Sequence, residues 1–416
     1  MYLTQTNTIR HLSKQQYAVL REMCVYANNL YNVALYHIRQ YYFSEKKFLT
    51  YESNYHECKM NENYSLLQAG ISQQILKIAD RSFKSFFNLI KKASSGEYRF
   101  KDIKMPHYRK KGGMFNLILS TNAISIKNGM FRIPVSRKFR ELHEDCLIEI
   151  PFPERIPEDS VKEIRILPYE KHFKIQYVYE TEPENLNLDI SKSLAVDIGV
   201  DNFAACVRND GTSFLIDGRK LKSINHHWNQ EKARLQSIAD KQGLKHTRKL
   251  SAITHKRNNR CKDYIKKTAR YLINDCIQNN IGTIVVGYTK DFKRSVSIGK
   301  VNNQNFTQIS FGDLRNSLQY LCERYGIQYL EVEESYTSKS SFLDNDILPE
   351  YFPERPYAGT FSGRRVYRGL YRSQTGKTLN ADINGACNIL RKSKQNFGFE
   401  ELCTGLLVSP MRIRIV

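Results

Sequence analysis

The chain has 416 residues, and its 64 Lys and Arg against 42 Asp and Glu give a formal net charge of +22. Its hydrophobic share of 41% and aromatic share of 12% exclude a mainly disordered protein, and its length predicts two or three domains. No apolar stretch approaches the roughly 18 residues that a membrane span requires. The first residues carry neither the basic nor the apolar segment of a secretory signal. We therefore expect a soluble, cytoplasmic protein without a membrane partner.

The positive charge predicts a polyanionic partner, most simply nucleic acid. Thirteen Lys and Arg, against three acids, lie between Glu231 and Arg270. The 26 tyrosines could add stacking surfaces for unpaired bases. The alternative is a basic surface that only maintains solubility. The nine cysteines are scattered and never form a CxxC pair, which favours reduced thiols over a disulfide framework or a zinc site.

The first half of the chain predicts helices inserted into a mostly β module. Residues 1–12 are expected to be extended, and residues from about 13 to 95 carry apolar side chains at the spacing of three and four that is typical of helices. Residues 105–190 change to short alternating runs broken by Asn-Gly and Pro, which indicate strands. A basic loop lies at 101–113 and contains Arg109, Lys110 and Lys111. It could be a solvated linker or a phosphate-binding loop.

The second half, 191–416, predicts an α/β domain after an acidic, Asn-rich boundary at 181–192. Its expected elements follow the order of an RNase H-like domain, with a strand, a hairpin, long basic helices, a buried strand, a helix, a strand and a last helix. We expect them at 194–200, 203–216, 228–280, 283–286, 311–325, 327–333 and from Ala381 onward. The basic helices contribute three candidate nucleic-acid contacts, Lys256, Arg257 and Arg260.

Two aspartates lie where a charge is hard to explain by folding alone. Asp197 falls inside the apolar run Leu194-Ala-Val-Asp-Ile-Gly-Val, and a buried ionised carboxylate needs a compensating partner such as a metal ion. Asp197 could instead lie at the exposed end of a strand. Asp382 could simply be an acid in the first turn of a helix, where its charge interacts favourably with the helix dipole. An RNase H-like order, however, brings a carboxylate of the first strand and one of the last helix to a common Mg²⁺ site.

Three motifs carry a resemblance to a known family. They read Ala195-Val-Asp-Ile-Gly-Val, Tyr336-Thr-Ser-Lys and Asn380-Ala-Asp-Ile-Asn-Gly-Ala-Cys-Asn-Ile. Together they resemble the TnpB family, the RNA-guided nucleases of IS200/IS605-like insertion sequences, which are related to Fanzors and type V CRISPR effectors. The resemblance implies a wedge-like β-barrel (1–12 and 105–190), a helical recognition insertion (13–104) and a RuvC-type RNase H domain (191–416). It also implies a guide RNA and a short motif beside the target.

The chain departs from this family at the third carboxylate. The usual Glu ends the strand that here reads Thr283-Ile-Val-Val-Gly-Tyr, where Gly287 holds its place. Some TnpB-like proteins and Fanzors carry this Glu just before the Thr-Ser motif, and this chain has Glu333-Glu334 there. Strand alternation puts Glu334 on the more apolar face, so we expect Glu334 rather than Glu333 to be the third ligand. An acidic strand edge is the alternative for both.

The second departure concerns zinc. The family often carries four cysteines between the Thr-Ser motif and the final Asp, but Ser340 stands where the first would fall. No Cys or His occurs from Ser341 to Asn380, so a tetrahedral zinc site cannot be built from this segment. We expect 337–380 to form a zinc-free insertion that binds the target nucleic acid. Its arginines could contact phosphates directly, namely Arg364, Arg365, Arg368 and Arg372.

These observations predict an α+β and α/β multidomain protein that acts as an RNA-guided DNA endonuclease. Asp197, Glu334 and Asp382 would hold two Mg²⁺ ions, and the basic helices would line the duplex of guide RNA and target DNA. The expected partners are a guide RNA and double-stranded target DNA, with the protein associated with the nucleoid. One alternative is a nuclease-dead, RNA-guided repressor, which Gly287 would favour. Another is a guide-independent transposase or junction resolvase.

Overall fold

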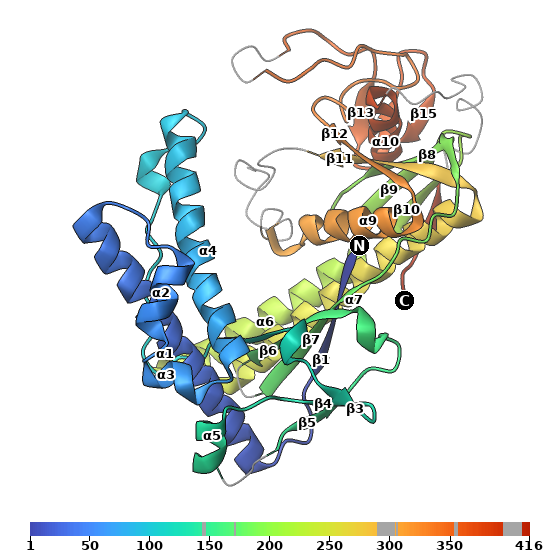
Figure 1. Cartoon of the computed structure of the whole chain (residues 1–416). Coiled ribbons are helices and arrows are strands. Elements are labelled where there is room, and N and C mark those ends of the chain that lie inside the picture. Colours follow the sequence, from blue (N-terminus) through green and yellow to red (C-terminus); the bar gives the residue numbers. More distant parts are fainter. Residues whose placement is uncertain (144–146, 170–171, 289–303, 305–306, 353–356, 394–409) are drawn as a thin grey trace. The chain divides into compact units, whose positions relative to one another are not determined.

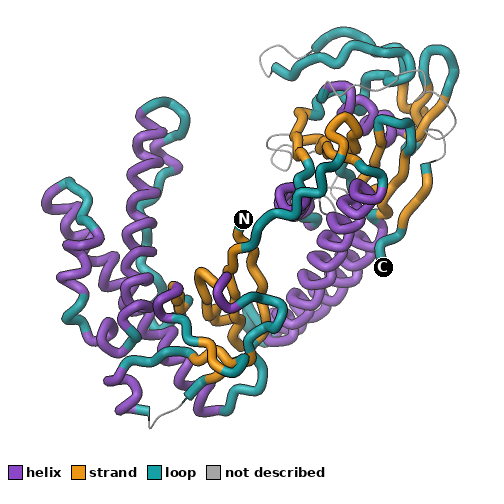
Figure 2. The backbone as a smooth tube through the Cα atoms, turned by 45° about the vertical axis from the view of Figure 1, so that its right-hand side comes forward, coloured by secondary structure: helices purple, strands orange, loops and turns teal. Residues whose placement is uncertain are grey.

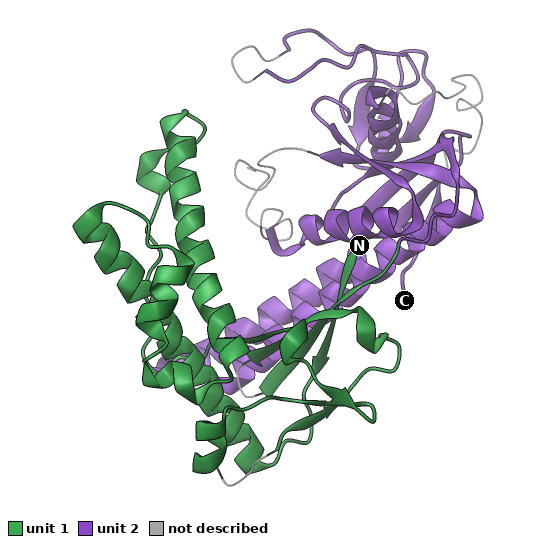
Figure 3. Ribbon diagram, in the orientation of Figure 1, with its two compact units in different colours: residues 1–182 green, residues 183–416 purple. Residues whose placement is uncertain are grey.

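The computed structural model describes residues 1–416 except 144–146, 170–171, 289–303, 305–306, 353–356 and 394–409. The chain forms two compact units, which comprise residues 1–182 and 183–416 (Figure 3). Within the described part of the chain, no helix has both the length and the apolar character needed to cross a membrane. The seven described cysteines are free and buried.

Unit 1 combines long helices with two small sheets (Figure 1). Its helices are α1 (Lys14–Glu45), α2 (Tyr51–Cys58), α3 (Glu62–Leu66), α4 (Ala69–Ser94) and α5 (Arg137–Leu142). α1 begins with a capping box, in which Ser13 accepts a hydrogen bond from the Gln16 amide and Gln16 accepts one from the Ser13 amide. The helices and both sheets share a single apolar core, which includes Leu20, Phe131 and Tyr177.

The first sheet of unit 1 has the strand order β1-β7-β6-β2. Its strands are β1 (Tyr2–Thr8), β2 (Leu117–Ser120), β6 (Val161–Tyr169) and β7 (His172–Glu180). β1 pairs antiparallel with β7, so helices α1–α4 are inserted between strands of one sheet. The second sheet has the order β3-β4-β5. It contains β3 (Ile126–Lys127), β4 (Met130–Arg132) and β5 (Glu149–Pro151).

Unit 2 is built on a six-stranded sheet of order β12-β11-β8-β9-β10-β16. Its strands are β8 (Asp189–Asp197), β9 (Asn202–Arg208), β10 (Ser213–Asp217), β11 (Ile281–Tyr288), β12 (Gln328–Glu333) and β16 (Met411–Ile413). β8, β9 and β10 pair antiparallel in turn, whereas β11 is parallel to β8 and β12 is parallel to β11. This order confirms the predicted RNase H-like arrangement. The segment 181–192 is not only a boundary, because β8 already begins at Asp189.

Helices cover both faces of this sheet. On one face pack α7 (Arg248–Gln278) and α9 (Phe311–Tyr325), and α6 (Arg219–Lys241) runs side by side with α7 (Figure 2). On the other face packs α10 (Ala381–Lys392), against Ala195 and Val285. A small sheet that was not predicted precedes α10, with the order β13-β14-β15. Its strands are β13 (Arg364–Tyr367), β14 (Leu370–Arg372) and β15 (Thr378–Asn380).

Candidate active site

The candidate site lies on the α10 face of the unit 2 sheet. The side chains of β8 alternate between the two faces of the sheet. Leu194 and Val196 face α7 and α9, whereas Ala195 packs with Val285 against Ile389 and Leu390 of α10. Asp197 is two residues beyond Ala195 and ends the strand on this same face. Its carboxylate points toward α10, the helix that carries Asp382, because Asp197 Oδ2 lies against Gly385 of that helix.

Gly287 and Glu334 meet at the next position of the sheet. In the register of the sheet, Gly287 of β11 pairs with Val332 of β12, and Val286 pairs with Val196 of β8. Asp197 therefore follows beside Gly287, and Glu334 lies two residues beyond Val332. The Glu334 amide donates to the Tyr288 carbonyl at 3.2 Å. A Cβ on Gly287 would lie 2.9 Å from Glu334 Oε2 and 2.5 Å from Ile389 Cδ1. The space above Gly287 is thus filled by the Glu334 carboxylate and by α10.

Glu333 is turned to different partners. Its Oε1 accepts a hydrogen bond from the Ser335 amide at 2.7 Å, and its Oε2 lies 3.2 Å from Lys392 Nζ. Burial raises the pKa of Glu333, but the hydrogen bond from Ser335 and the charge of Lys392 outweigh it and lower the pKa overall. The two neighbouring glutamates therefore have separate environments, and only Glu334 faces Gly287.

Asp382 lies in the first turn of α10. Asn380 caps this helix, because its side chain accepts hydrogen bonds from the amides of Asp382 at 2.9 Å and Ile383 at 3.3 Å. Asp382 Oδ2 accepts from Asn202 Nδ2 at 2.6 Å, and Oδ1 accepts from the Arg365 guanidinium at 3.2 Å. One turn further, a Cβ at Gly385 would collide with Asp197 Oδ2. Glycine at 385 thus lets Asp197 approach the helix.

The charges of Glu334 and Asp382 act on Asp197. Burial first, and then the negative charges of Glu334 and Asp382, raise the pKa of Asp197 well above its usual range, while Arg365 opposes this shift. Clustered carboxylate oxygens are the hard donors that Mg²⁺ prefers, so the donor set fits this ion. In the part of the chain that the structure describes, however, no three Asp, Glu, His or Cys side chains are arranged as metal ligands. Asp382 is instead held by Asn202 and Arg365.

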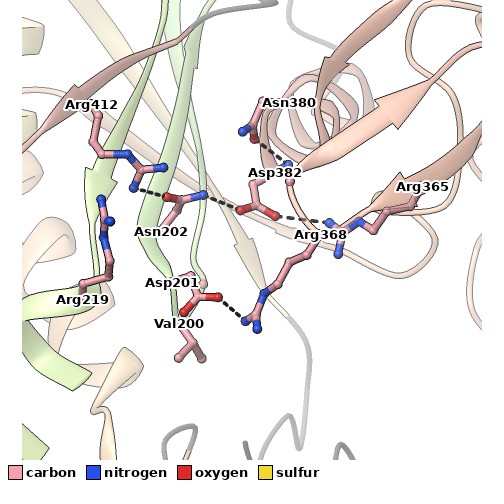
Figure 4. Close-up of a pocket in the computed structure, with 11 residues that line it drawn as sticks. Val200, Asp201, Asn202, Arg219, Arg365, Arg368, Asn380, Asp382 and Arg412 are labelled. Carbon is pink, nitrogen blue, oxygen red and sulfur yellow. Dashed lines mark hydrogen bonds and ion pairs between the residues drawn. The ribbon is translucent and has the colours of Figure 1, made fainter. Parts of the chain in front are cut away.

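A basic pocket of about 350 Å³ opens beside Asp382 (Figure 4). Arg365 and Arg368 enter it from the β13–β14 hairpin, and Arg368 pairs with Asp201. Arg412 reaches in from β16 and donates to Asn202 Oδ1 at 2.8 Å. Guanidinium groups beside carboxylates suit a phosphate backbone that approaches a metal-binding site.

Two family models and a curated relative match this chain. The family model of probable transposases, OrfB of IS605, matches residues 176–293, and the TNB domain model of Cas12f1-like proteins matches residues 311–389. The TnpB-like protein ORF457 of Acidianus two-tailed virus is 23% identical, over 94% of this chain and 86% of its own length. The chain is thus similar to a TnpB-like protein over almost its whole length. The family matches cover the segments that contain Asp197, Glu334 and Asp382.

The fold of this chain is also found in a solved structure. The Cas12f1–sgRNA–target DNA complex matches with a TM-score of 0.59 at 16% identity, over 91% of this chain and 83% of that chain. At this level of identity the likeness concerns the fold. The match covers 91% of this chain, so it includes parts of both unit 1 and unit 2.

The other predicted nucleic-acid contacts fall into two groups. Arg109 and Arg257 serve the fold, since Arg109 bonds Asn28 at 3.0 Å and Arg257 bonds Asn225 at 2.7 Å. The remaining members are exposed, namely Lys110, Lys111, Lys256, Arg260, Arg364 and Arg372. Arg364 and Arg372 are register partners in β13 and β14, so they project from one small sheet. The exposed group stays a prediction.

Sequence reasoning missed four residues of the pocket, which are Asp201, Asn202, Arg219 and Arg412. Asp201 and Asn202 follow Asp197 closely, but nothing in their sequence pattern marks their roles. Arg412 is 210 residues from Asn202. Only the parallel pairing of β16 with β10 brings it to the site.

The described residues of the segment 337–380 are joined by hydrogen bonds. Asp346 Oδ2 accepts from the amides of Ser341 at 2.7 Å and Ser362 at 3.0 Å. Asp344 Oδ2 accepts from the Ser341 hydroxyl at 2.5 Å and from the Gln374 amide at 2.9 Å. These carboxylates connect segments that are distant in sequence, as a structural zinc ion does in other proteins.

Proposed function

We propose that this chain is an RNA-guided DNA endonuclease that cleaves target DNA beside a short adjacent motif. The observation that supports this most strongly is the pairing of Gly287 with Glu334. A carboxylate from the end of β12 takes the position that a side chain on β11 would otherwise fill, on the same face as Asp197 and α10. A site that had lost its function would have no reason to keep this complementarity.

Asp197, Glu334 and Asp382 would hold two Mg²⁺ ions. When bound, Mg²⁺ would activate water for attack on the phosphodiester and stabilise charge on the leaving oxygen. Release of Asp382 from Arg365 would free one of its oxygens for this task.

The residues around the carboxylates would position the strand. Asn202 orients Asp382 through its 2.6 Å hydrogen bond, and Arg412 fixes the orientation of the Asn202 amide by donating to its oxygen. Arg365 and Arg368 would exchange their carboxylate partners for phosphate oxygens of the DNA strand. The exposed cations of α7 would bind the guide–target duplex through its backbone, while base pairing reads the sequence.

Two neighbouring substitutions test the proposal. Glu334→Gln keeps the size of the side chain but removes its charge, so cleavage of a guide-matched duplex in Mg²⁺ should fall by orders of magnitude. Glu333→Gln is the matched control and should retain most activity, because Glu333 is bound to Ser335 and Lys392. Target binding should survive both changes, since it depends on phosphate contacts and base pairing.

The same experiment separates the alternatives. Target binding without cleavage by the unmodified protein would replace the endonuclease with an RNA-guided repressor. Sequencing of RNA that co-purifies with the protein tests the guide. A protein that cleaves DNA without a defined RNA would be a guide-independent transposase or resolvase.

A further inference from the structure

A second pocket, remote in sequence from the carboxylates, lies between α6 and α7. It has a volume of about 210 Å³, and its walls include Trp228, Ile224 and Ile253. Pockets for drug-sized ligands measure roughly 300–1,000 Å³, so this one suits a smaller flat group. The apolar walls and the indole ring favour an aromatic ring as its occupant.

The indole of Trp228 is held in place and surrounded by positive charge. Its Nε1 donates to Thr254 Oγ1 at 3.2 Å. Arg257 Cζ lies over the indole ring at 5.1 Å from its centroid, and Lys232 Nζ lies over it at 4.9 Å. A base that stacks on this ring must therefore displace the flexible Lys232 side chain or share the ring with it. Arg257 is itself fixed by Asn225 and by the Gln308 carbonyl, at 2.7 and 2.6 Å. A ring held this way loses little freedom when a second ring stacks on it.

Charged side chains at the rim of the pocket can bind the phosphates and the sugar of a nucleotide. Lys256 and Arg260 line it and are exposed to solvent, where they can contact phosphates on either side of an inserted base. Glu231 also lines it, and its hydrogen bond from Arg234 at 2.9 Å lowers the pKa of Glu231 and keeps it ionised. A carboxylate repels phosphate but accepts a hydrogen bond from a ribose 2′-hydroxyl, which DNA lacks.

We propose that the α6–α7 pocket binds an unpaired ribonucleotide, with its base stacked in the pocket beside Trp228 and its 2′-hydroxyl on Glu231. The inference rests on the proposed RNA-guided function only in that an RNA must be present. It adds a base-binding site to a surface that would otherwise contact only the nucleic-acid backbone. Neither Mg²⁺ nor cleavage is required for it.

The chain contains a single tryptophan, so its intrinsic emission reports on this pocket alone. RNA-free full-length protein is titrated with labelled oligouridylate without Mg²⁺, and tryptophan emission and label anisotropy are followed together. Emission should be quenched in parallel with binding. Oligodeoxyuridylate, which lacks only the 2′-hydroxyl, should bind more weakly and quench less. Unchanged emission at saturating anisotropy would overturn the proposal, and equal quenching by both oligomers would overturn the assignment to RNA.

Variants locate the two contacts. Trp228→Leu should weaken oligouridylate binding by about tenfold, the effect of losing one stacked base. Glu231→Gln should reduce the preference for RNA over the deoxy oligomer. Asp240→Asn removes the same charge elsewhere on α6 and should leave the preference unchanged. If Asp240→Asn and Glu231→Gln act alike, the effect is general electrostatics and the proposed 2′-hydroxyl contact is wrong. Because the titration uses the unmodified protein, the test does not depend on the folding of any variant.

Discussion

A Cβ atom on Gly287 would lie 2.9 Å from Oε2 of Glu334. Gly287 lies in β11, and Glu334 directly follows the neighbouring parallel strand β12. The carboxylate of Glu334 occupies the space that Gly287 leaves open. Gly287 is fully buried beneath α10. Its lack of a side chain is therefore a packing requirement of the site, and it creates the position from which Glu334 faces Asp197.

This relationship predicts a strong effect of Gly287→Ala. The added methyl group would meet Ile389 at 2.5 Å as well as Glu334, so the glutamate, the helix or both must shift. We expect a loss of about 1–3 kcal/mol in the free energy of unfolding, and a cleavage rate at least about tenfold lower. Thermal denaturation and cleavage of a guide-matched duplex measure the two effects.

Gly312→Ala is the matched control for this change. A Cβ at Gly312 meets no atom within 4 Å, and the residue lies in α9, where alanine is preferred to glycine. This variant should be as stable as the parent or more so, with unchanged cleavage. Normal cleavage by Gly287→Ala would show that Glu334 does not need the space above Gly287.

Asn202 provides a second test, because it gives Asp382 a hydrogen bond of 2.6 Å. Asn202→Leu keeps the approximate size and removes this donor. The hydrogen bond involves a charged group, so we expect cleavage to fall roughly tenfold to a hundredfold with target binding retained. Asn209→Leu removes an amide from the same hairpin that bonds Ser191 and Ser193 instead. It should lower the melting temperature, but the folded protein should cleave normally.

The sequence could predict the sheet and its aspartates because their patterns are local. Asp197 is recognisable as an acid inside an apolar strand, and Asp382 as an acid in the first turn of a helix. Neither pattern requires tertiary information. Strand alternation also separates Glu334 from Glu333, and the structure gives these two side chains different partners. The assignment of all three acids as catalytic still awaits the substitutions.

The remaining parts of the site depend on contacts that no local pattern encodes. Arg412 meets Asn202 only because β16 pairs with β10. Arg257 and Arg260 carry the same charge and lie about one helical turn apart in α7. Arg257 nevertheless donates a hydrogen bond to Asn225, whereas Arg260 is exposed. Charge in the sequence cannot distinguish an arginine that holds the fold from one that can meet a phosphate.

The raised pKa of Asp197 predicts how stability depends on pH. Because of its burial and the neighbouring carboxylates, Asp197 holds a proton more tightly in the folded protein than in the unfolded chain. In the unfolded chain the pKa of an aspartate is about 3.9. In Mg²⁺-free buffer, the contribution of Asp197 to stability should therefore fall as pH rises above about 4 toward the folded pKa. Asp197→Asn removes the buried charge and should raise the melting temperature at neutral pH while it abolishes cleavage. A variant less stable than the parent at pH 7 would contradict this reasoning.

The insertion between the Thr-Ser motif and α10 should fold without zinc. Its segments are joined instead by Asp346, which accepts from the amides of Ser341 and Ser362. Dialysis against a chelator should leave the thermal transition and the hydrogen exchange of residues 337–352 unchanged, with well below one zinc per chain by metal analysis.

Asp346→Ala leaves the Ser341 and Ser362 amides without their acceptor and should lower the free energy of unfolding by about 1–3 kcal/mol. It should also increase exchange at Ser341. Glu350→Ala, at an exposed position of the same insertion, should change neither. A stoichiometric zinc ion whose removal unfolds this insertion would show that a metal, rather than these carboxylates, holds it together.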